Sequence, residues 1–67
     1  MTIGEVIATR IFFRKLTQAE FAKLAGTTQS NISNIIAGKK SPTLKMLEKI
    51  AKALHTTVSE LTKEVKR

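Results

Sequence analysis

Apolar side chains recur along the chain at the spacing of α-helices. In residues 3–11 they fall three or four positions apart, which predicts a helix with one apolar face. Later segments repeat this spacing, and we expect them to form further helices packed on the first. The positions predicted to face the core are Ile3, Val6, Ile7 and Ile11, then Phe21, Ala22 and Leu24, then Ile32 and Ile35, then Leu44, Leu47, Ile50, Ala51 and Leu54, and last Val58, Leu61 and Val65.

Threonines and glycines mark the predicted ends of these helices. Thr17 is followed three positions later by Glu20, the pattern of a capping box that opens a helix, and Thr57 with Glu60 repeats it. Gly26 is predicted to stop the helix that begins after Thr17, because glycine adopts the left-handed conformation without steric cost. The remaining predicted N-caps are Thr28 and Thr43.

No strand-like alternation, linker or internal repeat interrupts this helical pattern. We therefore expect an all-α fold in which five helices form one compact domain over residues 1–67. A chain of 67 residues is near the lower limit for folding around a single core, and it leaves little room for a large catalytic cleft.

Composition narrows the chemistry that this domain can perform. The chain has no cysteine and one histidine, which excludes a disulfide framework, a thiolate metal site and an imidazole cluster. Because the sequence also lacks a nucleophile–base pair, we expect neither an enzyme nor a bound metal or cofactor. No stretch has the length and apolarity of a transmembrane helix, which predicts a soluble, cytoplasmic protein.

The balance of charge indicates an anionic partner. Twelve lysines and arginines against five acidic residues give a net charge of +7, which favours nucleic acid or an acidic membrane surface. A membrane-surface protein would need a basic amphipathic helix, and the one candidate, residues 3–11, needs its apolar face for the core. Nucleic acid is therefore the favoured partner, with a basic domain that has no anionic partner as the alternative.

One segment departs from this basic character. Residues 26–40 carry no charge until their last two positions, Lys39 and Lys40, and no acidic residue lies between Phe21 and Leu47. An ordinary surface helix would favour Glu, Lys and Ala, which form helices more readily than Asn, Ser and Thr. The uncharged polar residues of the segment are Thr27, Thr28, Gln29, Ser30, Asn31, Ser33 and Asn34.

Several sequence features within residues 16–61 occur together in a known family. They are Thr17-Gln18 at the start of the second helix, Ala22 where the second and third helices cross, Gly26 in the turn, Ile32 in the third helix, Gly38 before the lysines, and Ser59-Glu60-Leu61 near the end. At these spacings the sequence resembles the lambda-repressor-like helix-turn-helix family, the Xre/Cro type of phage and bacterial repressors. The resemblance places the helix-turn-helix motif at about residues 17–36 and its recognition helix at about residues 28–36.

The resemblance also implies which side chains meet DNA. Amides match the paired donors and acceptors of base edges in the major groove, whereas cations hold the phosphates, which are the same in every sequence. Gln18 is expected to orient Gln29 as well. The implied base-reading positions are Gln29, Ser30 and Asn34, with Asn31 and Ser33 as neighbours, and the implied phosphate-binding positions are Gln18, Thr28, Lys39 and Lys40.

A protein of this family is expected to regulate transcription, as a repressor that binds double-stranded DNA. The resemblance implies a homodimer on a pseudo-palindromic operator, without a cofactor, in the cytoplasm of a bacterium and on its nucleoid when bound. It places the dimer contact at Val58, Leu61 and Val65. The alternative is the antitoxin of a toxin–antitoxin pair, which would keep the DNA surface for autoregulation and add a protein partner.

Among the features that depart from the family pattern, one is an aromatic pair and another lies at a predicted helix end. Phe12 and Phe13 stand where relatives are often polar, and we expect either the C-terminal segment or another subunit to cover them. His55 stands where the family usually has glycine at the end of a helix. We interpret His55 as an adapted helix stop, because no partner residue accompanies it that would indicate metal binding or catalysis.

Overall fold

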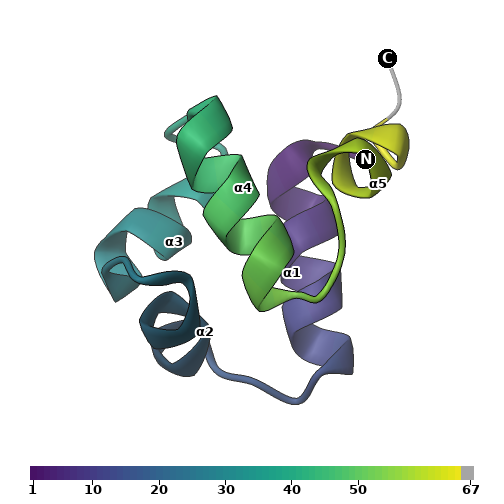
Figure 1. Cartoon of the computed structure of the whole chain (residues 1–67). Coiled ribbons are helices and arrows are strands. Elements are labelled where there is room, and N and C mark those ends of the chain that lie inside the picture. The colour runs from purple at the N-terminus through teal and green to yellow at the C-terminus, as the bar shows by residue number, and fades with distance from the viewer. Residues whose placement is uncertain (66–67) are drawn as a thin grey trace.

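The computed structural model describes residues 1–65, which form five α-helices and no strand. The helices are α1 (Ile3–Phe13), α2 (Gln18–Ala25), α3 (Gln29–Ile36), α4 (Leu44–Ala53) and α5 (Val58–Lys63) (Figure 1). The predicted all-α, five-helix fold is thereby confirmed. The two C-terminal residues, Lys66 and Arg67, lie outside the described part of the chain.

A threonine precedes each of the helices and caps it. The hydroxyl oxygen of each threonine accepts a hydrogen bond from the backbone N–H three residues later, which satisfies a donor that has no partner inside the helix. The capping box predicted at Thr17 and Glu20 is present in full. At Thr57 the structure shows the hydroxyl half of the predicted box, from Glu60 N–H. The caps are Thr2, Thr17, Thr28, Thr43 and Thr57.

Left-handed residues end the first four helices. Gly26 and Gly38 have φ values of 72° and 79°, while Lys15 and His55 take the same conformation at 58° and 57°. The residue after each one donates its backbone N–H to a carbonyl five positions back, the bond that closes a Schellman turn. The interpretation of His55 as an adapted helix stop is confirmed, and Lys15 plays the same part at the end of α1. The four closing bonds are Leu16 to Ile11, Thr27 to Ala22, Lys39 to Asn34 and Thr56 to Ala51.

The core lies between the helices that contact one another. α3 packs on α1 and α2, α4 packs on α2 and α5, and α5 also packs on α1. Most of the predicted core positions are buried there, and several others pack against them at its edge. The buried apolar residues are Val6, Ile7, Ile11, Phe21, Ala22, Ala25, Ile32, Ile35, Ile50, Ala51, Leu54 and Leu61.

Two leucines predicted to face the core lie on the surface instead. Leu24 is 61% exposed, because α2 turns Phe21, Ala22 and Ala25 inward and the position before Ala25 points about 100° away. Leu44 is 64% exposed in the first turn of α4, which Figure 1 shows at the outer end of the helix, away from α2. Both predictions were wrong, because helical spacing alone does not set which edge of an apolar stripe meets a neighbour.

A close backbone approach sets the position of α3 against α1. A Cβ atom built on Gly4 would lie 2.5 Å from the carbonyl oxygen of Ile35 and 2.7 Å from that of Ile36. No side chain fits in that space, so glycine lets the first turn of α1 touch the backbone at the C-terminal end of α3. This contact helps to determine how α3 is presented to its surroundings.

The two phenylalanines at the end of α1 are uncovered in the described part of the chain. Phe12 and Phe13 are 77% and 75% exposed, and their rings meet edge to face with centroids 6.0 Å apart. The C-terminal segment up to Val65 therefore does not cover them.

Candidate nucleic-acid interface

The polar segment of the sequence forms the outer surface of α3. Ile32 and Ile35 anchor this helix in the core, and Thr28 caps its N-terminal end. Gln29 and Ser30 are exposed and Asn34 is half-exposed. Because residues four apart share one face of a helix, Ser30 and Asn34 form a single row with Gln29 beside it. These three predicted base-reading side chains can therefore face one ligand together.

Ser33 is directed toward α2. Its hydroxyl group donates a hydrogen bond of 2.7 Å to Oε1 of Gln18, and both side chains are half-buried. The bond joins the first residue of α2 to the middle of α3. It leaves the amide nitrogen of Gln18 as a donor for an anion at the surface. The sequence paired Gln18 with Gln29; in the structure the partner of Gln18 is Ser33.

Asn31 is also engaged within the chain. Its Nδ2 donates to the Thr27 hydroxyl at 2.9 Å and contacts the Met46 sulfur at 3.7 Å, and its Oδ1 accepts from the Lys40 ammonium at 2.7 Å. The amide thus connects the turn before α3, helix α4 and the loop after α3. A base contact by Asn31 would require these bonds to be exchanged.

Cationic and backbone donors lie at the two ends of α3. At its start, Thr28 and the first amide groups carry the positive end of the helix dipole, which favours anions. At its end, Gly38 turns the chain so that Lys39 and Lys40 follow directly, both exposed. The uncharged surface of α3 is therefore flanked by groups suited to phosphates.

The sequence did not predict the side-chain hydrogen bonds that connect this surface to the rest of the domain. The bond between Thr27 and Asn31 spans four residues, from the turn before α3 into the first turn of the helix. The contact of Asn31 with Met46 and the bond between Gln18 and Ser33 each span fifteen residues. No local pattern signals such pairs, because they depend on how the helices pack.

The comparison with protein families agrees with this geometry. The model of the helix-turn-helix family HTH_3 matches residues 14–61. The chain belongs to this Xre-type helix-turn-helix family. The matched residues contain α2, α3 and the turn between them, which form the helix-turn-helix itself. A search of curated protein sequences found no match.

Solved structures similar to this helix-turn-helix domain include two of the P22 c2 repressor. The solution structure of its DNA-binding domain has a TM-score of 0.91 and 28% identity, over 96% of this chain and 84% of that one. The P22 c2 repressor in complex with a synthetic operator has a TM-score of 0.84 and 28% identity, over 91% and 92% of the two chains. The protein is thus a helix-turn-helix DNA-binding domain like those of phage repressors.

Two further structures contain the same domain within longer chains. The match in the SinR–SinI complex has a TM-score of 0.87 and 28% identity, and it covers 94% of this chain but 62% of that one. The iron enzyme HppE, solved in complex with its substrate, has a TM-score of 0.78 and 28% identity over 88% of this chain and 34% of the enzyme. The likeness to HppE is confined to about a third of the enzyme, so it indicates a shared domain only.

Residues 1–65 contain no cluster of three or more His, Cys, Asp or Glu side chains suited to a metal ion. In the same residues no helix has both the length and the apolarity required to cross a bilayer.

Proposed function

We propose that this helix-turn-helix domain is a transcription regulator, a repressor, that reads duplex DNA with α3 as a homodimer on a pseudo-palindromic operator. The observation that carries the proposal is the uncharged row on α3, exposed at Gln29 and Ser30 and half-exposed at Asn34. The Ser33–Gln18 hydrogen bond joins this helix to α2. The P22 c2 repressor, solved with a synthetic operator and similar over most of its chain, supports it.

In this proposal, different residues recognise the bases and bind the phosphates. Gln29, Ser30 and Asn34 read bases, since amides and hydroxyls offer the donors and acceptors that base edges require. Gln18, Thr28, Lys39 and Lys40 bind phosphates, which supply affinity and register but no sequence information. Ser33 and Asn31 act as positioning residues, through their bonds to Gln18 and Lys40. No cofactor takes part.

Two copies are proposed because one copy reads too little DNA. A single recognition helix contacts only a few base pairs, so a selective site requires two half-sites whose centres lie roughly 34 Å apart. Val58 and Val65 are half-buried and can contribute to the contact between copies. Leu61, which the sequence also placed there, is fully buried in the core of its own chain, so its side chain has no surface left to offer.

The proposal is tested by selecting bound sequences from a randomised duplex pool and footprinting the protein on the result. We expect an inverted repeat with two protected half-sites, one for each copy. We propose that the protein acts on such sites in the cytoplasm, where the sequence places it. Enrichment of no sequence at all, or protection of one asymmetric half-turn, would overturn it. The antitoxin alternative predicts in addition that an acidic protein copurifies with the chain.

A further inference from the structure

We propose that Phe12, Phe13 and the groove beside them form a contact surface for a second copy of this chain. The proposal rests on the homodimer of the proposed function, and it chooses between the C-terminal segment and another subunit, the two covers for these rings that the sequence left open. Both rings are about three-quarters exposed, although exposed apolar groups of this size usually gain stability by being covered.

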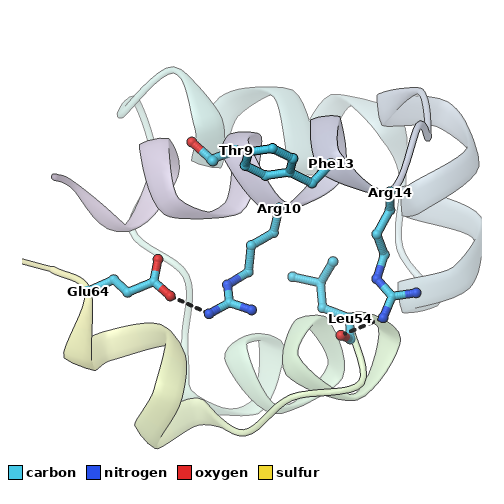
Figure 2. A pocket seen from close by; sticks show the side chains of 6 residues that line it. All are labelled: Thr9, Arg10, Phe13, Arg14, Leu54 and Glu64. Carbon is cyan, nitrogen blue, oxygen red and sulfur yellow. Dashed lines mark hydrogen bonds and ion pairs between the residues drawn. The ribbon is translucent and has the colours of Figure 1, made fainter.

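Phe13, whose ring contacts that of Phe12, lines a groove of about 300 Å³ between α1 and the end of α4 (Figure 2). In Figure 2, Arg10 and Arg14 extend from α1 toward α5 and α4, where Arg10 pairs with Glu64 and Arg14 donates to the Leu54 carbonyl at 3.1 Å. These bonds connect α1 to α5 and to the end of α4 across the groove. Its lining residues are Thr9, Arg10, Phe13, Arg14, Leu54 and Glu64.

A protruding ring and a groove on the same face of a protein can form a self-complementary interface between two copies. In a two-fold dimer, each copy presents the same patch, so a group that protrudes from one must enter a recess in the other. Phe12 protrudes beside the groove that Phe13 lines, and the groove has room for an aromatic side chain. Phe13 and the aliphatic stems of Arg10 and Arg14 line the groove, and these groups suit an apolar guest.

The place of this surface in the fold suits two copies on one operator. Figure 1 shows α2 and α3 on one side of the molecule, with α5 and the C-terminal end of α1 on the other. The domain measures 28 × 24 × 22 Å, which is shorter than the roughly 34 Å between adjacent half-sites. Copies that meet through the α1 and α5 side keep both α3 helices free.

Charge makes this contact weak and gives it a distinctive dependence on salt. The Arg10–Glu64 pair is internally neutral, but Arg14 and Lys15 add positive charge next to the rings. The rings contribute on the order of 300 Å² per copy, against about 800 Å² per partner in stable complexes. Salt should therefore strengthen self-association by screening the repulsion between copies, whereas it weakens binding to DNA.

The experiment is sedimentation of the DNA-free chain over a range of protein and salt concentrations. We expect a monomer–dimer equilibrium whose association constant rises with salt, and which Phe12→Ala or Phe13→Ala lowers at least tenfold. Leu24→Ala and Leu44→Ala are matched controls, since each removes a comparably exposed apolar side chain elsewhere, and both should leave the constant unchanged. Circular dichroism verifies that each variant is folded.

A wild-type chain that stays monomeric at every concentration, or control variants that weaken the dimer as much as Phe12→Ala, would overturn the inference. Binding to an isolated half-site separates this outcome from failure of the proposed function. The phenylalanine variants should bind a half-site as the wild type does and lose cooperativity on the complete operator. If the wild type dimerises through these rings but selects no DNA sequence, the proposed function fails and the contact surface stands.

Discussion

The ammonium group of Lys40 donates a 2.7 Å hydrogen bond to Oδ1 of Asn31, across the loop that ends α3. Asn31 is held in turn by Thr27 and Met46, so the loop, α3 and α4 fix the lysine together. Side chains of one type on one helix thus differ in what they can do. Asn34 is half-exposed like Asn31, but Asn31 is hydrogen-bonded to the Lys40 ammonium group.

Replacing Gln29 should remove sequence reading without removing general affinity. A glutamine can contact one base through two hydrogen bonds, so Gln29→Ala is expected to cost about 1–3 kcal/mol on the selected operator and much less on a scrambled duplex. Asn34→Ala should act likewise at a different base pair. Titrations on both duplexes measure the difference. Equal losses on the two would show that these residues bind the backbone.

Replacing Lys39 should reduce affinity for DNA of any sequence, unlike replacing Gln29. Its expected ligand is a phosphate, so Lys39→Ala should weaken binding to operator and scrambled duplex about equally. The slope of log affinity against log salt should fall in magnitude by about one per protomer, since one fewer counterion is released. Lys63→Ala, an exposed lysine on α5, is the control and should leave that slope unchanged. An effect of Lys39→Ala on operator alone would contradict the assignment.

Asn31 should act through Lys40. Asn31→Ala is expected to weaken operator and scrambled duplex alike, because it releases the lysine rather than removing a base contact. In a Lys40→Ala background the same change should add little, so the two losses should not sum. A double-mutant cycle of DNA affinities measures this coupling. Strictly additive losses would show that Asn31 acts independently of Lys40, and a loss on operator only would show that Asn31 reads a base itself.

Gly4 should resist a substitution that ordinarily favours helices. Alanine is a better helix former by about 1 kcal/mol, yet its Cβ would collide with the carbonyl oxygens of Ile35 and Ile36. Gly4→Ala is therefore expected to destabilise the fold by about 1–3 kcal/mol or more, as overpacking does. Urea unfolding gives the value. Gly38→Ala is the comparison, since it has no neighbour within 4 Å and should lose only about 1–2 kcal/mol to backbone strain. A stabilised Gly4→Ala variant would mean that the two helices separate readily.

His55 should be improvable as a helix stop. It holds a left-handed conformation that glycine adopts freely, so His55→Gly should raise the free energy of unfolding by about 0.5–1 kcal/mol after the added flexibility of the unfolded chain is subtracted. Lys52→Gly, within α4, should instead lower stability by about 1 kcal/mol. Thermal unfolding of both variants decides the matter. A destabilised His55→Gly variant would indicate that the imidazole makes a favourable contact.

The sequence by itself determined the features that depend on neighbours along the chain. Helical spacing predicted the five helices, threonines marked the starts of the last four, and Gly26 marked the turn after α2. These features could be predicted because periodicity, capping and left-handed helix stops depend on neighbouring residues in the sequence. The Thr2 cap and the left-handed Lys15 were not anticipated, although they too are local. The resemblance to a family supplied the candidate interface, which composition alone did not reach.

Tertiary structure decided how residues with similar sequence patterns differ in burial and in contacts. Leu24 and Leu44 belong to apolar patterns as regular as that of Leu61, yet they are exposed and Leu61 is buried, since burial depends on which helix lies opposite. Asn31 and Asn34 are the same residue type on one helix, yet only Asn31 contacts α4 and the lysine loop. Such differences arise from contacts between residues far apart in sequence, whose geometry exists only after the helices have packed.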